Sequence, residues 1–270
     1  MDDCEGMLLQ HLHDCVSLST LCISKVSSLA CLPDSSLKNI TALRVLKLSN
    51  CSELVTLWEG TGSDNFCSLQ RFEVWCCQKL ISLPEELPPI LQHLKLMYCS
   101  NLESLSQGMH HIPLVDFEIC NVDKLTSFPE VRLPNTLKRL VIKECKNLQH
   151  LPNSIHNLTS LELLEIRRCP LRESFPGEGL PVTLKWISIF KCDNLRSLPD
   201  ELHNLISLKE LRISNVPKLA SLPDCGLPTM LSYLDIDACP LLIARCNKED
   251  GDWFKVAHVP NKRIDGKEIF

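Results

Sequence analysis

The chain has 270 residues, of which 44% are hydrophobic and 5% aromatic, and 33 acidic against 28 basic residues give it a net charge of -5. Lysines and arginines are spread along the chain and form no basic stripe, so no nucleic-acid partner is expected. No apolar run approaches the roughly 20 residues that cross a bilayer, and the start, MDDCEG, lacks the pattern of a signal peptide. We therefore expect a protein in a reducing, cytoplasmic compartment without membrane contact.

Residues 1–17 resemble a degraded or truncated repeat. The segment LLQHLHDC, from Leu8 to Cys15, matches ILQHLKLMYC, from Ile90 to Cys99, with two residues missing. Stacked repeats need a terminal cap with a polar outer face, and this segment shows none. We interpret the chain as a fragment, a truncated gene copy or the product of an incomplete gene model.

Residues 18–243 carry about ten copies of a leucine template, L-x-x-L-x-I-x-x-C-x-x-L-x-x-L-P, at spacings of 22–26 residues. The copies start at Leu18, Leu43, Leu69, Leu91, Leu114, Leu137, Leu161, Leu184, Leu208 and Leu231. A phrase that begins at Cys145 recurs 47 residues later from Cys192, which indicates duplication of a two-repeat unit. Among their differences, Arg167 and Arg168 of the first copy become Ser214 and Asn215 in the second, on the open face of the strand.

Each template copy predicts one short strand with two buried side chains. Leu140 and Ile142, two residues apart, point to one side of a strand, whereas Val141 and Lys143 point to the other. Burial of each such apolar side chain is worth roughly 1.5–3 kcal/mol, so stacked copies build a continuous core. The expected fold is an α/β solenoid, a leucine-rich-repeat horseshoe with a parallel β-sheet on its concave face.

The segments that return between strands are of two kinds. Some are helix-prone, as in LPNSIHNLTSL and LPDELHNLISL, and others are rich in proline and glycine, as in FPGEGLPVTL and LPDCGLPTML. Because proline and glycine interrupt α-helices, we expect a convex side of 3₁₀ turns and irregular backbone. Residues 244–270 are expected to form a C-terminal cap, with Trp253, Phe254 and Val256 covering the last coil.

Seven of the sixteen cysteines occupy the cysteine position of the template. These are Cys51, Cys77, Cys99, Cys145, Cys169, Cys192 and Cys239. Valine takes the same position at Val26, Val122 and Val216, so a small buried group suits it. Neighbouring strands lie about 4.8 Å apart, which also brings disulfide geometry within reach. A ladder of buried free thiols is the favoured interpretation.

The register of the template also predicts two rows of exposed strand positions on the concave face. The first row begins Lys47, Glu73, Lys95 and Glu118, whose alternating charges favour pairing across strands. The second row is rich in aromatic and basic residues, which are enriched in binding hot spots. The candidate partner-binding residues of this second row and its surroundings are Trp75, Met97, Tyr98, Lys143, Arg167, Arg168, Trp186, Phe190, Lys191, Arg212 and Tyr233.

Catalytic and metal-binding motifs are not found in the sequence. It contains no G-x-S-x-G, no H-E-x-x-H and no phosphate-binding loop, and Gly266-Lys267 is followed by Glu268. His11, His13 and Cys15, or His110 and His111, lack the paired spacing typical of zinc sites. We predict no enzymatic activity, no cofactor and no bound nucleotide.

The phrases NLTSLELLEIRRCP, GLPVTLKWISIFKCDNLRSLP and CPLLIARCNKEDGDWFKVAHVPNKRIDGK resemble the C-terminal end of plant intracellular disease-resistance proteins. Those proteins combine a nucleotide-binding switch domain with leucine-rich repeats. The resemblance implies a non-enzymatic protein-interaction module in plant defence, which recognises an effector, autoinhibits a nucleotide-binding switch domain absent from this chain, or does both. Its partner is a pathogen effector or the nucleotide-binding domain of the same or a sister protein.

Two alternatives keep the same fold. A secreted receptor fragment or enzyme inhibitor would use the N-x-[ST] motifs at Asn39, Asn50 and Asn157 for glycans. A truncated gene copy would have no function of its own.

Overall fold

The computed structural model describes the parts of the chain given by the ranges 12, 15–32, 37, 40–58, 66–128, 132–152, 154–170, 174–175, 177–246 and 251–269. The chain divides into two compact units, Met1–Leu137 and Lys138–Phe270. Most of the predicted degraded repeat, including His11 and His13, and the N-x-[ST] motif at Asn39 lie outside the described residues.

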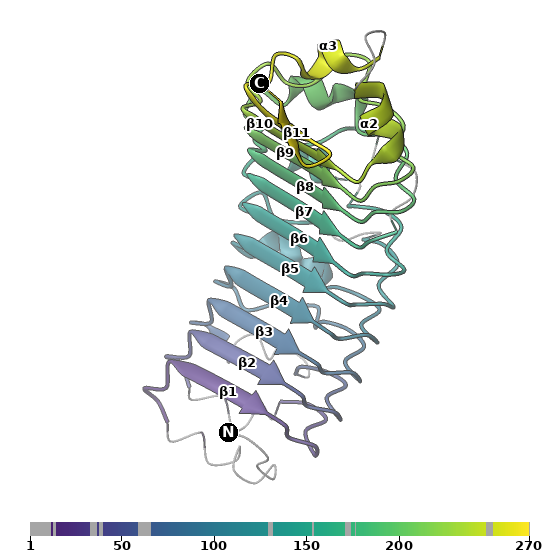
Figure 1. The fold of residues 1–270 in the computed structure, drawn as a ribbon. Helices are drawn as coiled ribbons and strands as arrows, with labels where there is room; N and C mark the ends of the chain where they lie inside the picture. Colours follow the sequence, from purple (N-terminus) through teal and green to yellow (C-terminus); the bar gives the residue numbers. More distant parts are fainter. Residues whose placement is uncertain are drawn as a thin grey trace. The chain divides into compact units, whose positions relative to one another are not determined.

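The first unit contains a parallel sheet whose strands follow one another in chain order (Figure 1). Its strands are β1 (Thr20–Ser24), β2 (Val45–Ser49), β3 (Arg71–Trp75), β4 (His93–Met97) and β5 (Asp116–Cys120). Equivalent template positions lie side by side, as in the register of Phe72 with Leu94. The repeat period therefore sets the strand register directly, because the same five template positions form the strand in each copy.

The second unit has the same arrangement, with a mostly parallel sheet. Its strands are β6 (Arg139–Lys143), β7 (Leu163–Arg167), β8 (Trp186–Phe190), β9 (Glu210–Ser214), β10 (Tyr233–Asp237), β11 (Asn261–Ile264) and β12 (Lys267–Ile269). Only β12 runs antiparallel, against β11. The predicted leucine-rich-repeat solenoid with a parallel sheet is thereby confirmed, and strands β1 to β10 coincide with the ten template copies.

The core consists of the template leucines and the second and fourth residue of each strand. Leu140 and Ile142 are fully buried, as are Leu164 and Ile166 in the next coil. Leu18, the first template leucine, is only half-buried, which agrees with its place in the first described coil. Because a repeat buries its apolar side only against a neighbouring coil, the core is built by stacking.

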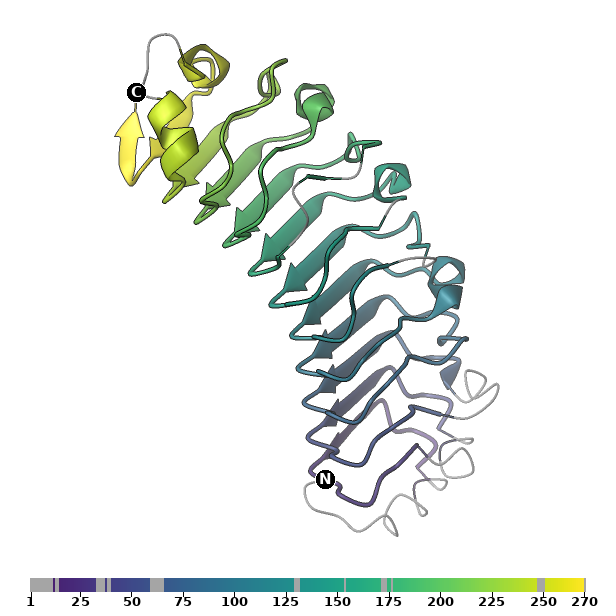
Figure 2. The same cartoon turned by 90° about the vertical axis from the view of Figure 1, so that its right-hand side faces the viewer.

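The return segments match the two predicted kinds. Short 3₁₀ helices lie on the side of each unit away from the strands (Figure 2). They are η3 (Gln107–His111), η4 (Ile155–Asn157) and η5 (Asp200–Asn204). Both helix-prone segments form one of these helices, whereas the described residues of the two Pro/Gly-rich segments form none.

Gly108 is required where η3 contacts the preceding coil. A Cβ atom at this position would lie 2.6 Å from the backbone oxygen of Glu85. The hydroxyl of Ser106 donates to that same oxygen at 2.6 Å and accepts from the Gly108 N–H at 3.2 Å, which caps the helix. This close approach explains a glycine inside a 3₁₀ helix.

The residue that follows each strand adopts a left-handed conformation, which the sequence did not reveal. The ten residues, with φ between 50° and 57°, are Lys25, Asn50, Cys76, Tyr98, Asn121, Glu144, Arg168, Lys191, Asn215 and Ala238. Their backbone N–H groups extend the ladder past the strand end, as in Arg168 N–H to Phe190 O at 2.8 Å and Lys191 N–H to Ser214 O at 2.9 Å. We call these ten positions the left-handed row.

The template cysteines are buried, as predicted, and they are free thiols. Each donates its S–H to the carbonyl two residues earlier, for example Cys145 to Lys143 O at 3.2 Å and Cys239 to Asp237 O at 3.3 Å. Burial raises the pKa of the Cys99 thiol to about 11 and that of Cys192 to about 12. These two thiols therefore stay protonated at neutral pH and serve as packing groups.

The buried position of Cys169 leads to a testable ranking of substitutions. Cys169→Val places at this position the residue found at Val216. The free energy of unfolding should change by less than about 1 kcal/mol, because valine is a small apolar side chain of a size that this buried position accepts. Cys169→Ser should destabilise by about 1–2 kcal/mol, because a hydroxyl costs more to bury than a thiol. Urea unfolding of the two variants checks this. A valine variant less stable than the serine variant would show that the S–H hydrogen bond outweighs apolar packing.

The C-terminal residues add a further coil and close it. Helices α2 (Pro240–Cys246) and α3 (Trp253–Val256) precede β11, which pairs in parallel with β10. A tight turn with Asp265 at φ 51° and Gly266 at φ 73° joins β11 to the short β12. The edge strand β12 carries Lys267 and Glu268, charged residues that discourage further strand pairing.

Helix α3 covers the last coil with one side only. Val256 is fully buried and Trp253 is half-buried, but Phe254 is 67% exposed, so its predicted role in covering the coil is wrong. Residues three apart share a face of a helical turn, whereas adjacent residues point about 100° apart. Trp253 and Val256 can therefore face the coil together, and Phe254 points outward.

Candidate protein-interaction surface

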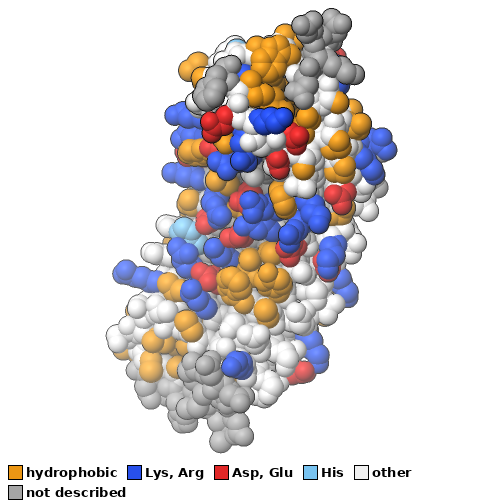
Figure 3. Space-filling view, in the orientation of Figure 1, with side chains coloured by type: hydrophobic (Ala, Val, Ile, Leu, Met, Phe, Trp, Pro, Cys, Tyr) orange, Lys and Arg blue, Asp and Glu red, His pale blue; other side chains and the backbone are white. Residues whose placement is uncertain are grey.

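The outward side chains of the strands, together with the left-handed row, form what we call the open face of each unit. First, third and fifth strand residues point outward because alternate side chains of a strand lie on opposite sides of the sheet. Figure 3 shows lysine and arginine side chains interspersed with acidic ones over the strands of the second unit. It also shows a hydrophobic cluster over the strands of the first unit.

In the first unit, the predicted charge pairing across strands is confirmed. Lys47 lies 3.1 Å from Glu73 on the next strand, and Lys95 lies 3.0 Å from Glu118. Both glutamates are buried, with 6% of their surface exposed. Opposite charges directly across a sheet are worth roughly 0.2–1 kcal/mol, so these pairs stabilise the register and leave little free charge on this face.

The predicted anchors of the first unit differ in exposure. Tyr98 is 39% exposed in the left-handed row, and Trp75 is half-buried with its indole N–H 3.4 Å from Glu73. Met97, predicted to be exposed, is only 8% exposed. It lies in register between Trp75 and Cys120, whose side chains flank it at the spacing of neighbouring strands. Met97 therefore packs between these two side chains and presents little surface to a partner.

In the second unit, Arg167 is the centre of a group of predicted anchors. Its guanidinium lies 5.5 Å from the ring centroid of Phe190 and 2.8 Å from Glu165. Lys143, on the neighbouring strand, lies 3.6 Å from the same glutamate. A stacked and paired arginine loses less conformational freedom on binding, which preorganises it for a partner.

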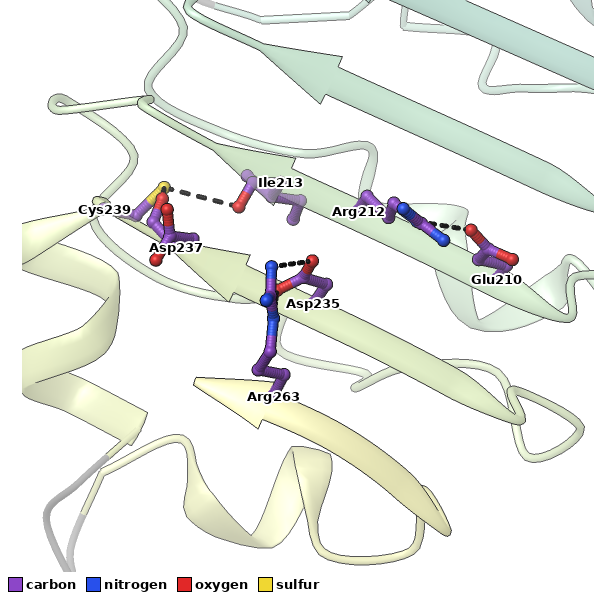
Figure 4. A network of polar contacts seen from close by, with 7 residues as sticks. All are labelled: Glu210, Arg212, Ile213, Asp235, Asp237, Cys239 and Arg263. Carbon is purple, nitrogen blue, oxygen red and sulfur yellow. Dashed lines mark hydrogen bonds and ion pairs between the residues drawn. The ribbon is translucent and has the colours of Figure 1, made fainter. Parts of the chain in front are cut away.

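The same combination of a basic side chain and an aromatic ring occurs at Trp186 and between Arg212 and Tyr233. Trp186 is 39% exposed, with the Lys185 ammonium 5.9 Å from its ring. Arg212 lies 5.2 Å from the ring of Tyr233 and pairs with Glu210 (Figure 4). Aromatic residues and arginines are the side chains most enriched in protein-binding hot spots.

Arg168 and Lys191 lie in the left-handed row, at the ends of β7 and β8. Arg168 donates to Glu144 at 2.8 Å, and both basic side chains line a pocket of about 440 Å³. The structure thus brings Lys143, Arg167, Arg168, Trp186, Phe190, Lys191, Arg212 and Tyr233 together on the second unit. Trp75, Met97 and Tyr98 belong to the first unit.

Sequence reasoning missed Arg263 as part of this surface. Arg263 lies on β11 in register with Asp235 and forms two hydrogen bonds with its carboxylate, at 3.0 and 2.9 Å (Figure 4). This contact raises the pKa of Arg263. The leucine template ends at β10, so the only signal for β11 was the Asp-Gly turn that follows it.

The other sequence motifs form no site within the described ranges. His110 and His111 stack with their ring centroids 3.8 Å apart at the end of η3. Among the described residues, no group of three histidine, cysteine or acidic side chains could hold a metal ion. A helix both long and apolar enough to cross a membrane is not found there either. Asn50 and Asn157 are exposed.

The fold and this surface define a leucine-rich-repeat protein. The leucine-rich repeat domain of the type III effector XCV3220 (XopL) has the same fold, with a TM-score of 0.56 and 22% sequence identity over 86% of this chain and 81% of that chain. No protein-family model matches the sequence.

The chain is a homologue of plant disease-resistance proteins, as the sequence resemblance predicted. It is 31% identical over 182 residues to Disease resistance protein RPP4 of Arabidopsis thaliana, which covers 59% of this chain. It is 33% identical over 139 residues to Protein SUPPRESSOR OF npr1-1, CONSTITUTIVE 1 of the same plant, which covers 51% of this chain. The matches span 15% and 9% of those relatives, so the chain corresponds to a small part of their length.

Proposed function

We propose that the chain is a non-enzymatic protein-interaction module of plant defence that acts in the cytoplasm. Its partner is a pathogen effector, or the nucleotide-binding domain of the same or a sister protein. The homologues support the biological context. The observation that carries the proposal is the alignment of Arg167 with Phe190, of Arg212 with Tyr233 and of exposed Trp186 on one open face.

The geometry supports binding more than catalysis. The aromatic rings and guanidinium groups are held by neighbouring strands, and their acidic neighbours fix their orientation. Such preorganised anchors provide contact area at a low entropic cost. The candidate binding residues are the predicted set, with Met97 as a packing residue of the first unit and Arg263 as an addition.

Paired variants test this proposal. Arg167→Ala with Trp186→Ala should weaken binding to the partner at least about tenfold, because truncation of hot-spot residues costs more than about 1.4 kcal/mol. Trp75→Ala tests the first unit separately. The probes are a panel of pathogen effectors and the recombinant nucleotide-binding domain of a plant disease-resistance protein, measured by biolayer interferometry.

The control is Ile206→Ala, which removes an apolar side chain that is 71% exposed but precedes β9 and lies outside the open face. Circular dichroism verifies that each variant keeps its fold. Equal binding by wild type and by the Arg167→Ala/Trp186→Ala variant would show that this open face is not the interaction surface.

A further inference from the structure

The pocket of about 440 Å³ on the second unit carries an inference beyond general protein binding. It is formed where β6, β7 and β8 end and their chains turn. Its lining residues are Glu144, Lys146, Arg168, Cys169, Pro170, Lys191 and Asp193. Five of these seven carry a formal charge, three positive and two negative, in a chain whose overall charge is -5.

The basic groups of the pocket are arranged to accept an anion. The Glu144 carboxylate holds Arg168 through Nη1 at 2.8 Å. Since a guanidinium has five N–H donors in a fixed fork, this contact orients the group and leaves donors for a second acceptor. Lys191 is exposed and forms no ion pair within the described part of the chain. The pocket therefore has an oriented cation, Arg168, and an exposed cation without an ion pair among the described residues, Lys191, beside a third basic residue, Lys146.

The backbone conformation sets where these two side chains leave the chain. Arg168 and Lys191 have φ values of 51° and 52°. Asparagine tolerates this left-handed region better than other side chains with a Cβ, and it takes the same place at Asn50, Asn121 and Asn215. Seven of the ten positions of the left-handed row carry other residues, so this conformation belongs to every coil, and asparagine fits it equally well.

We propose that this pocket binds a carboxylate side chain from an acidic segment of the partner protein, through Arg168 and Lys191. The inference rests on the proposed function and names the chemistry of its partner. Isolated carboxylates fit the alternation of charge, because Glu144 and Asp193 line the same pocket and Glu165 lies beside Arg167. A continuous phosphate backbone would meet these acidic groups at close range. The neighbouring Phe190 offers contact to an apolar residue of the same segment.

The test uses the full chain and a fluorescein-labelled peptide of alternating glutamate and leucine, with binding followed by fluorescence anisotropy. Arg168→Asn with Lys191→Asn should weaken binding about tenfold, since each removed charge contact contributes a few-fold. Both substitutions copy residues that the same turn already carries, so the fold should persist. Lys138→Asn with Lys209→Asn, two exposed lysines before β6 and β9, is the control with the same change of net charge.

The expected pattern also includes weaker binding at higher salt and no binding of a peptide with glutamine in place of glutamate. Equal loss of affinity in the control variant would overturn the assignment of the pocket. Tighter binding of a phosphoserine peptide than of the glutamate peptide, or binding of duplex DNA that the Asn variant abolishes, would overturn the carboxylate assignment.

The outcome is separable from that of the proposed function. If Arg167→Ala/Trp186→Ala abolishes partner binding while Arg168→Asn/Lys191→Asn leaves peptide binding unchanged, the interaction surface stands and the acidic segment is wrong. If Arg168→Asn/Lys191→Asn loses peptide binding while Arg167→Ala/Trp186→Ala keeps partner binding, the pocket binds carboxylates but the proposed surface is wrong.

Discussion

Replacing Asp252 with alanine is expected to lower the free energy of unfolding by about 3–5 kcal/mol, because it removes the buried carboxylate that pairs with the buried Lys255 ammonium. The Asp252 carboxylate lies 3.0 Å from the Lys255 ammonium, and the two side chains are 1% and 4% exposed. Asp252 also accepts the Leu222 N–H at 2.9 Å, while Lys255 donates to the Leu222 carbonyl at 3.0 Å. This network fastens the C-terminal cap to the loop after β9.

Urea unfolding measures the total loss, and hydrogen exchange of the β11 amides shows whether the cap opens first. Asp224→Ala is the matched control: its fully exposed carboxylate lies 3.5 Å from the same lysine, and its removal should have little effect. An Asp252→Ala variant within about 1 kcal/mol of wild type would show that the network does not stabilise the cap.

The same residue predicts a dependence of stability on pH. Burial by itself raises the pKa of Asp252, but hydrogen bonds from Leu222 and Lys255, with the charges of Lys255 and Arg245, outweigh it and lower the pKa below its usual value of 3.8. The unfolded chain then takes up this proton first as the pH falls. The stabilisation by Asp252 is therefore complete above about pH 5 and is lost as the pH falls through the folded-state pKa. The stability difference between wild type and Asp252→Asn should shrink accordingly between pH 6 and pH 3.

Replacing Phe72 with alanine is expected to destabilise the first unit by about 3–5 kcal/mol, because it opens a large cavity in the core. Phe72 is fully buried on β3, and its ring centroid lies 5.9 Å from that of Trp58. Trp58 in turn lies 5.2 Å from Phe66. Loss of the Phe72 ring removes packing from Trp58 directly. Trp58 fluorescence during urea unfolding reports the change.

Phe72→Leu is the matched control, because leucine occupies the equivalent position at Leu46 and Leu94 on the adjoining strands. This substitution should cost about half as much, since leucine fills most of the space. Equal stabilities of the alanine and leucine variants would contradict cavity formation as the cause.

The solenoid could be predicted because the leucine template places apolar residues at the same positions in every copy. The alternation of Leu140, Val141 and Ile142 sets which side of the strand faces the core, although Val141 on the other side is also buried, and the 22–26 residue period sets the register between coils. The pairing of Lys47 with Glu73 across neighbouring strands follows from that register alone. Each such prediction depends on residues at a fixed place in the repeat, where one coil is like the next.

The candidate surface could be predicted only in part. The outward direction of Trp186 and Arg167 follows from strand alternation, but the exposure of a side chain also depends on the size of its neighbours. Met97 is buried because Trp75 and Cys120 flank it, and the template carries no information on that packing. Phe254 points outward because it shares no helix face with Val256.

The parallel sheet, the buried thiol ladder and the rows of outward residues could be predicted from the residue pattern, because they depend on spacing along a regular strand. The left-handed turns at Arg168 and Lys191, the pocket between them and the Asp252–Lys255 network in the cap became visible in the folded chain alone. These features join residues of different coils through backbone geometry and desolvation, which depend on three-dimensional contacts and leave no periodic signal in the chain.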